Sequence, residues 1–199
     1  MNLEYPKLLV VMALEQEDAG AFIRADIPVH YTGYGKINAT FSLTRRLADY
    51  VSAARELPVV VNFGTAGGKA MYVGHNVECT SFIQRDMDAT ALGCAPGTTP
   101  FDSVPHELRV SAMTGRLQTV VCGTGDSFAT ANSFADIDVV DMEAYALAKV
   151  CFLYGARFAC IKHVTDGADH EAAESWQANV SRAGLDYVEL YKEIAAKSG

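Results

Sequence analysis

Four polar segments of this sequence come directly after apolar runs, and each contains side chains suited to acid–base chemistry or hydrogen bonding. They are residues 15–17, 62–65, 123–126 and 165–166. Glu17 and Asp166, in the first and last of them, carry carboxyl groups, which can take up or give up a proton in acid–base catalysis. The sequence therefore directs attention to whatever brings these segments together.

The apolar runs that precede them predict buried strands. Continuous apolar stretches are typical of strands covered on both faces, and apolar residues at helical spacing predict helices. Predicted strands are 8–14, 29–34, 59–63, 77–83, 117–122 and 158–164. One predicted helix begins at the acidic turn 15–18, and further predicted helices cover residues 37–51, 142–154 and 176–194. Residues 94–106 are predicted to form a surface loop.

Strands that alternate with helices indicate a largely parallel sheet with helices on both faces. We therefore predict an α/β fold, one domain over residues 1–199, with three α/β/α layers around a central mixed, largely parallel sheet. In open sheets of this kind the ligand crevice lies beyond the carboxyl ends of the strands. The four polar segments are expected to meet there.

Composition excludes several classes of function. The formal net charge is -8 and the Lys and Arg residues are scattered, which argues against a nucleic-acid partner. No segment is long and apolar enough to predict a membrane span, and no secretory leader is evident. Five cysteines without a CxxC pair indicate reduced thiols and a cytoplasmic protein. No His/Cys motif predicts a metal, and no cofactor is expected.

Seven short stretches, in order along the chain, resemble the nucleoside phosphorylase and nucleosidase superfamily, and most of all its methylthioadenosine/S-adenosylhomocysteine nucleosidase branch. They are residues 12–17, 32–38, 61–68, 85–93, 125–128, 140–144 and 164–169. The resemblance implies a nucleoside phosphorylase-like fold. It also implies hydrolysis of the N-glycosidic bond of an adenosine-type purine nucleoside, with water as the nucleophile.

The resemblance further implies a role for individual residues. Glu17 would activate the water, Glu143 would receive the ribose hydroxyls, and Asp166 would protonate purine N7 as the base leaves. The remaining substrate contacts that it implies are Thr65 near water and sugar, Phe128 stacked on the purine with Ala129 at its edge, Met142, Thr165, Lys162 near the water, and Tyr34 and Trp176 at the 5′ end.

The chemistry gives these roles a reason. Cleavage of the bond places negative charge on the departing base and positive character on the ribose, so an acid at N7 and carboxylates near the sugar both help. Each contribution of this kind is typically worth about 10²–10⁴-fold. Asp166 needs a raised pKa to arrive protonated, and a site dried by Phe128 and Trp176 favours that.

Structural roles compete with each functional interpretation. Glu17 could simply complement a helix dipole, Glu143 could be a first-turn carboxylate, and Asp166 could lie in a plain turn. Phe128 and Trp176 could be core or rim aromatics. The functional interpretation prevails because the residues occur together in family order.

Several alternatives stay open. Asn62 replaces the arginine that phosphate-using relatives carry, which favours water, although Arg24 is still available to phosphate. Tyr34 replaces a usually aliphatic residue at the 5′ end, which predicts a narrower or more polar pocket, so an unmodified or 5′-deoxy purine nucleoside, or futalosine, is another candidate substrate. A nucleoside-binding or storage protein without activity is a third alternative, disfavoured by the three carboxylates. Family members assemble as dimers or larger, and a homodimer is expected here.

Overall fold

The computed structural model describes residues 5–129, 136–169, 172–180 and 182–198. Its strands are β1 (Leu8–Met12), β2 (Val29–Tyr31), β3 (Val59–Gly68), β4 (Asn76–Gln84), β5 (Glu107–Arg109), β6 (Gln118–Thr124), β7 (Val139–Asp141) and β8 (Phe158–Asp166). The α-helices are α1 (Ala21–Arg24), α2 (Lys36–Ser52), α3 (Ala144–Tyr154), α4 (Ala172–Asn179) and α5 (Gly184–Ser198). Three 3₁₀ turns are η1 (Glu15–Glu17), η2 (Ala70–Tyr72) and η3 (Thr90–Leu92).

The strands form one mixed sheet that closes on itself. Its order is β2-β1-β3-β7-β6-β4-β5, and β8 pairs with both β3 and β4. The strands β3, β8, β4, β6 and β7 therefore form a closed ring, which we call the strand ring. The parallel pairs are β1 with β2, β1 with β3, β3 with β8, β4 with β6, and β6 with β7; the others are antiparallel. This arrangement confirms the predicted mixed, largely parallel sheet.

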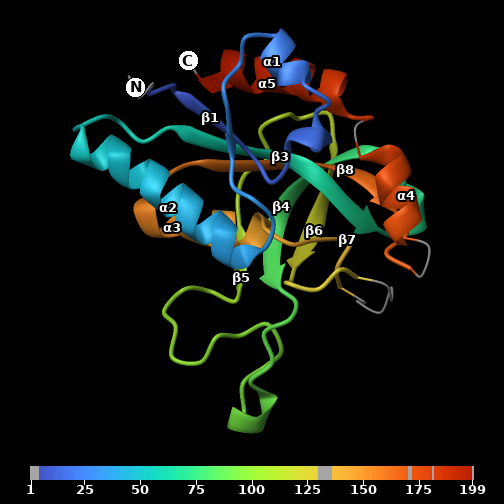
Figure 1. The fold of residues 1–199 in the computed structure, drawn as a ribbon. Coiled ribbons are helices and arrows are strands. Elements are labelled where there is room, and N and C mark those ends of the chain that lie inside the picture. Colours follow the sequence, from blue (N-terminus) through green and yellow to red (C-terminus); the bar gives the residue numbers. More distant parts are fainter. Residues whose placement is uncertain (1–4, 130–135, 170–171, 181, 199) are drawn as a thin grey trace.

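Side chains of the central strands alternate between two hydrophobic cores. On β3, Val60 packs into one core with α2 and α3, whereas Val61 and Phe63 pack into the other with α1 and α5. Figure 1 shows the same division, with α1 and α5 together on one side of the sheet and α2 with α3 on the other. Because both faces of these strands are covered, their sequences read as unbroken apolar runs.

Several strands extend further than predicted, and the glycine segment after residue 63 is part of one of them. The segment from Gly64 to Gly68 continues β3, which pairs with β8 as far as Gly67, across a register shift, and with β7 at Gly67 and Gly68. A Cβ on Gly67 would lie 2.6 Å from Asp166 Oδ1, and one on Gly68 would lie 2.9 Å from a Val139 methyl carbon. Glycine is required here by close packing between neighbouring strands rather than by a turn.

The predicted C-terminal helix over 176–194 is wrong as a single element. The structure has α4 and α5 instead, separated between Asn179 and Gly184. A Cβ on Gly184 would lie 2.1 Å from the carbonyl oxygen of Asp18. The start of α5 therefore lies directly against the backbone that follows β1, a contact that a continued α4 could not make.

The predicted helix opening at 15–18 is also shorter than expected. Residues 15–17 form only the turn η1, and the four-residue helix α1 starts later, at Ala21. Asp18 caps it, because its carboxylate accepts the backbone N–H groups of Gly20 and Phe22 at 2.9 Å each. Residues 142–143 likewise precede α3.

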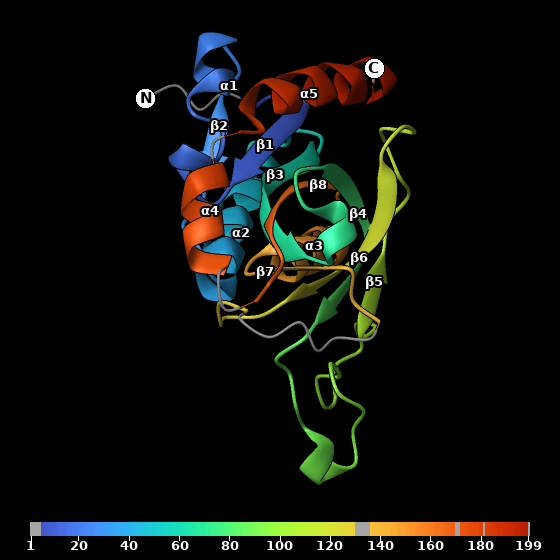
Figure 2. The same cartoon turned by 90° about the vertical axis from the view of Figure 1, so that its right-hand side faces the viewer.

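Two short strands, and the full extent of a long projection, had no signal in the sequence. β5 and β7 are three residues long each. β5 pairs with β4, and β7 pairs with both β3 and β6. Between β4 and β5, residues 85–106 form a projection that we call the arm. Figures 1 and 2 show the arm extending away from the sheet and its helices. It contains the predicted surface loop 94–106.

The core around α1 and α5 allows a test of packing. Phe22 is fully buried, with its ring centroid 5.3 Å from that of Phe63, whereas the adjacent Ile23 is 69% exposed. We expect Phe22→Ala to lower the free energy of unfolding by about 3–5 kcal/mol. Ile23→Ala, the matched control on the same helix, should stay within about 0.5 kcal/mol. Equal losses in urea unfolding of the two variants would contradict this packing.

Candidate active site

A cavity of about 510 Å³ opens where the strands end at their carboxyl side. Its walls come from the segments after β1, β4 and β6, from β3 and β7, from the end of β8, and from α4. The lining residues are Ala13, Leu14, Gln16, Glu17, Tyr34, Thr65, Ala66, Gly67, Arg85, Ser127, Phe128, Ala129, Val140, Asp141, Met142, Glu143, Asp166 and Trp176. Three of the four polar segments identified in the sequence (15–17, 62–65 and 165–166) contribute to this lining, and the fourth, 123–126, directly precedes the lining residues Ser127 to Ala129.

Glu17 is buried in the turn after β1 and is held by three donors. Its Oε1 accepts the backbone N–H of Thr65 at 2.8 Å and the Thr65 hydroxyl at 3.0 Å, and its Oε2 accepts the Leu14 N–H at 3.1 Å. The indole N–H of Trp176 donates to the same Thr65 hydroxyl oxygen at 3.0 Å. This chain of hydrogen bonds connects α4, β3 and the segment after β1, and fixes where the Glu17 carboxylate lies.

Glu143 is buried between β7 and α3, and its Oε1 accepts the N–H of Gly35 at 2.8 Å. Burial raises the pKa of Glu143 to about 8, with the nearby Asp141 carboxylate as the next largest cause. The Lys162 ammonium and the Gly35 N–H oppose the rise. A carboxyl group with this pKa is largely protonated at neutral pH and can donate as well as accept.

Asp166 ends β8, where Thr165 and Ala168 hold its carboxyl group. The Thr165 hydroxyl donates to Asp166 Oδ2 at 2.7 Å, and the Ala168 N–H donates to Oδ1 at 2.9 Å. Burial raises the pKa of Asp166, although these two hydrogen bonds act in the opposite direction. The direction of this shift is the one that a general acid needs.

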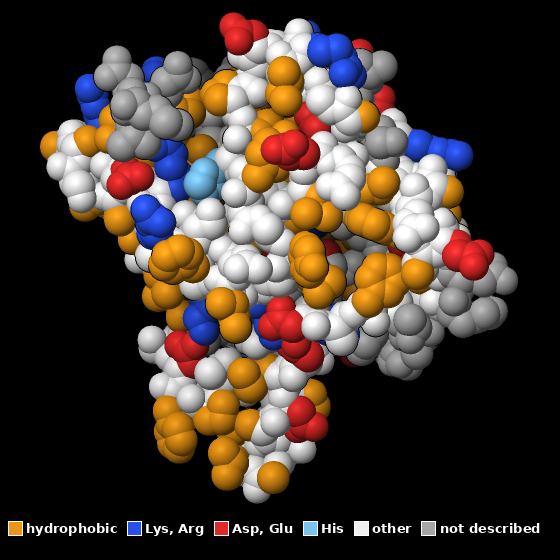
Figure 3. All heavy atoms as spheres, viewed as in Figure 1, with side chains coloured by type: hydrophobic (Ala, Val, Ile, Leu, Met, Phe, Trp, Pro, Cys, Tyr) orange, Lys and Arg blue, Asp and Glu red, His pale blue; other side chains and the backbone are white. Residues whose placement is uncertain are grey.

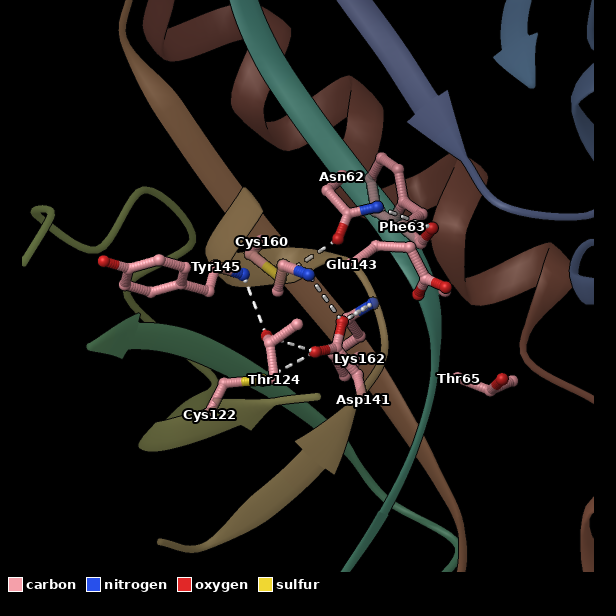
Figure 4. A network of polar contacts seen from close by, with 12 residues as sticks. Asn62, Phe63, Thr65, Cys122, Thr124, Asp141, Glu143, Tyr145, Cys160 and Lys162 are labelled. Carbon is pink, nitrogen blue, oxygen red and sulfur yellow. Dashed lines mark hydrogen bonds and ion pairs between the residues drawn. The ribbon is translucent and has the colours of Figure 1, made fainter. Parts of the chain in front are cut away.

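A buried ion pair joins Asp141, in the cavity wall, to Lys162 behind it, with Nζ 2.9 Å from Oδ2. Asp141 also accepts the Thr124 hydroxyl at 2.6 Å, the Ala144 N–H at 2.8 Å and the Cys122 thiol at 3.5 Å. Figure 4 shows these groups as one network that connects β6, β7, α3 and β8. Although burial works against both charged forms, the pair lowers the pKa of Asp141 and raises that of Lys162.

Nine of the eleven predicted site residues line the cavity, and two do not. Lys162 is 1% exposed and faces Asp141 from behind the wall. This position does not support the predicted direct contact with substrate or water. Thr165 is equally buried and contacts Asp166 instead. Both predictions came from position in a motif, which does not distinguish a lining residue from one that supports it.

The aromatic side chains frame the cavity. Trp176 is anchored to Thr65, whereas Phe128 is 46% exposed and Tyr34 is 63% exposed. Phe128 is therefore not a core residue, and of the two structural alternatives considered for it, core or rim, its exposure leaves only the rim. Figure 3 shows hydrophobic side chains gathered on the face that carries these elements.

Sequence reasoning missed four polar residues of the cavity wall: Gln16, Arg85, Ser127 and Asp141. Arg85 donates to the Ser127 hydroxyl at 3.2 Å, which places it beside Phe128. Asp141 lies within the matched stretch 140–144, but only its pairing with Lys162, a contact distant in sequence, reveals its importance.

No helix in the described ranges is long and apolar enough to cross a membrane. Among the same residues, no group of three His, Cys, Asp or Glu side chains is arranged to hold a metal ion.

Residues 23–196 match the family model of the phosphorylase superfamily. The chain belongs to this superfamily. Within it, the chain is similar to the 5′-methylthioadenosine/S-adenosylhomocysteine nucleosidase of Marinomonas sp., with 31% identity over 179 residues covering 79% of this chain and 75% of the relative. Its counterpart from Anoxybacillus flavithermus is 31% identical over 193 residues, covering 86% and 81%.

Solved structures share the fold. A Helicobacter pylori nucleosidase with 5′-methylthioadenosine in its active site superposes with a TM-score of 0.82 at 18% identity, covering 98% of this chain and 100% of that one. The futalosine hydrolase of Helicobacter pylori superposes with a TM-score of 0.80 at 18% identity, covering 96% and 97%. These likenesses confirm the predicted nucleoside phosphorylase-like fold.

The raised pKa of Glu143 predicts a pH-dependent stability. The folded-state pKa is about 8 and the ordinary value is 4.5, so between these pH values only the folded state keeps the proton. The free energy of unfolding should therefore fall as pH rises through this window, by at most about 1.4 kcal/mol per pH unit. Glu143→Gln has no proton to lose. Its free energy of unfolding should therefore rise relative to that of the wild type as pH increases across the window.

Urea unfolding of the ligand-free protein at pH 5, 6, 7 and 8 measures this difference. Glu15→Gln is the matched control, because Glu15 is exposed. A difference between Glu143→Gln and the wild type that stays constant with pH would contradict the assigned shift.

Proposed function

We propose that this protein hydrolyses the N-glycosidic bond of an adenosine-type purine nucleoside such as 5′-methylthioadenosine, releasing free base and sugar. The observation that carries the proposal is the convergence of Glu17, Glu143 and Asp166 on one cavity from three separate elements. The named activity of the relatives at 31% identity supports it.

Glu17 is suited to activate water. The Thr65 hydroxyl donates a hydrogen bond to Glu17, because its oxygen already accepts the Trp176 N–H. Three hydrogen bonds do not use all the lone pairs of the carboxylate, so Glu17 can accept a further hydrogen bond from a water in the cavity that it lines. A water bound there would lose its proton to Glu17 as its oxygen attacks the sugar carbon.

Asp166 is suited to protonate the base. Its raised pKa increases the protonated fraction, and Thr165 and Ala168 fix the carboxyl group in place. Transfer of its proton to purine N7 would neutralise the charge that the broken bond leaves on the base. Phe128, half-exposed at the cavity, offers a ring for the purine to stack on.

Glu143 is suited to bind the ribose hydroxyls. Its Oε1 is occupied by the Gly35 N–H, and the rest of the carboxyl group borders the cavity next to Met142. At neutral pH the largely protonated Glu143 would act mainly through such hydrogen bonds, and its ionised fraction would also stabilise the positive character that develops on the sugar.

Water rather than phosphate is the proposed nucleophile. Asn62 lies in the core, where its amide donates to the carbonyl oxygens of Val11 and Phe63 and its Oδ1 accepts the Cys160 thiol. Arg24 does not line the cavity and donates to the carbonyl of Ala19. Arg85 is the only arginine or lysine among the lining residues that the structure describes, and it lies on the Ser127 side.

Futalosine is the second candidate substrate. Tyr34, at the proposed 5′ end, lines the cavity and is 63% exposed, so a substituent bound there would meet a polar hydroxyl rather than an aliphatic side chain. The futalosine hydrolase fold also matches this chain.

We place the protein in the cytoplasm. All five cysteines are free, and four of them are buried. Free thiols in this number are typical of a reducing compartment.

The role of Asp166 has a direct test. Asp166→Asn keeps the shape of the side chain but has no acidic proton, so release of adenine from 5′-methylthioadenosine should fall at least about tenfold. Chromatography of the free base measures the rate. Asp26→Asn, at an exposed position outside the cavity, is the control and should keep the wild-type rate. Unchanged release by Asp166→Asn would refute the mechanism.

The same assay decides substrate and nucleophile. A panel of 5′-methylthioadenosine, S-adenosylhomocysteine, adenosine, inosine and futalosine, each with and without phosphate, should show base release that does not depend on phosphate. Formation of a sugar 1-phosphate would establish phosphorolysis instead. Binding without release of base from any member would favour the storage protein.

We further propose a homodimer. Ile37 and Phe41 lie one turn apart on α2 and are 81% and 63% exposed. On the arm, Leu92 and Phe101 are exposed as well, and Figure 3 shows hydrophobic side chains over this projection. Apolar residues in such numbers on a surface commonly mark contacts between subunits.

Light scattering should therefore give a mass near twice 21.4 kDa for the wild type. Ile37→Glu combined with Phe41→Glu should give a monomer, because two charges would be buried at the interface. Ile23→Glu, an equally exposed residue on the opposite side of the sheet, should leave the dimer intact. A monomeric wild type at working concentration would contradict the proposal.

A further inference from the structure

Lys162 is a charged side chain that the proposed mechanism does not use. Its ammonium lies in the interior, paired with Asp141 at 2.9 Å. A buried charge costs several kcal/mol unless it is compensated, so a lysine kept at this position needs a reason.

More than one carboxylate shares the ammonium. Besides Asp141, the charges of Glu143 and Glu17 also act on Lys162 and raise its pKa. Gly64 shows how close they come, because a Cβ there would lie 3.0 Å from Glu17 Oε1 and 3.2 Å from Lys162 Nζ. Glu17 and Lys162 thus approach the same point of β3, one of them from the cavity side.

Asp141 is fixed independently of Lys162. The Thr124 hydroxyl and the Ala144 N–H hold its two oxygens, and its side chain is only 1% exposed. Figure 4 shows Asp141 at the centre of this network, joined to Lys162, with Glu143 close by. A negative charge held there competes with Glu17 and Glu143 for the same cation.

The other ionisable groups near this cluster are a phenol and thiols. Burial raises the pKa of Tyr187, whose hydroxyl donates to the Gly64 carbonyl, well above its usual value. The pKa of Cys122 is raised to about 11, and the Cys160 thiol donates to Asn62. Asp141 and Lys162 form the ion pair that this network holds beside the cavity carboxyls.

We infer that Asp141 and Lys162 act together as a positioning pair that sets the protonation of the Glu17 and Glu143 carboxyl groups, with Lys162 favouring their ionised forms and Asp141 limiting that effect. The inference rests on the proposed function for its catalytic meaning. It assigns roles to two residues that touch neither the reacting carbon nor the base.

Opposite effects follow from removing the two charges. Without the ammonium, in Lys162→Met, the cavity carboxyls lose the cation and their pKa values rise. Without the Asp141 charge, in Asp141→Asn, Lys162 acts on them unopposed and their pKa values fall. A residue that only supported the fold would not produce shifts of opposite sign.

The pH profile of kcat/KM for 5′-methylthioadenosine gives the first readout. The acidic limb, where Glu17 must lose its proton, should move to higher pH in Lys162→Met and to lower pH in Asp141→Asn, by about one unit each. Lys162→Arg, which keeps the charge, should retain the wild-type limb. The double variant Asp141→Asn/Lys162→Met, which leaves no unpaired buried charge, should return close to it.

Glu78→Gln is the control for general damage. Glu78 is a carboxylate buried elsewhere, which accepts the backbone N–H of Thr114 at 3.1 Å. Its replacement should lower stability without moving the profile. If Lys162→Met does not fold, Asp141→Asn and the double variant still decide the matter.

A titration without turnover separates this inference from the proposed function. The glutamate carboxyl carbons, labelled with ¹³C, are followed by NMR in the ligand-free protein, with Glu143→Gln used to assign the Glu143 signal. Shifts of opposite sign in Lys162→Met and Asp141→Asn support the inference even if no nucleoside is cleaved. A Glu143 midpoint that stays in place, or moves the same way in both variants, overturns it even if the enzyme is active.

Discussion

The parallel pairing of β3 with β8 is the constraint on which the site depends. It runs from Val60 opposite Phe158 to Ala66 opposite Val164 in one register, and a one-residue shift then places Gly67 opposite Asp166. Along this pairing Lys162 comes to lie opposite Gly64, and the acid Asp166 reaches the same sheet edge as Thr65. The glycines of β3 are the condition for this, because a side chain at Gly67 would occupy the place of the Asp166 carboxyl group.

The site is built at some cost to the stability of the fold. Replacing a buried ion pair by apolar residues of similar volume is often neutral or stabilising, so Asp141 and Lys162 are poorly explained by stability alone. Glu143 likewise loses favourable solvation by being buried. Charged groups placed in the interior next to a cavity are instead what active sites use to adjust proton affinities.

Much of this architecture could be predicted from the sequence because it depends on local patterns. Apolar runs located β1, β3, β4, β6 and β8, and the family order of Glu17, Glu143 and Asp166 placed all three at one edge. Contacts between distant segments had no such signal. Nothing local indicates that Lys162 faces Asp141, that Gly184 lies against the Asp18 carbonyl, or that β8 also pairs with β4.

The strand ring has a consequence for solubility. Open sheets expose the backbone donors and acceptors of their outermost strands, which can recruit strands of other molecules and begin aggregation. Here β3, β8, β4, β6 and β7 each have neighbours within the ring, so β2 and β5 are the outermost strands of the described sheet. Each is three residues long, and β5 carries the charged side chains of Glu107 and Arg109. The closure that assembles the cavity therefore also leaves little edge for intermolecular strand pairing.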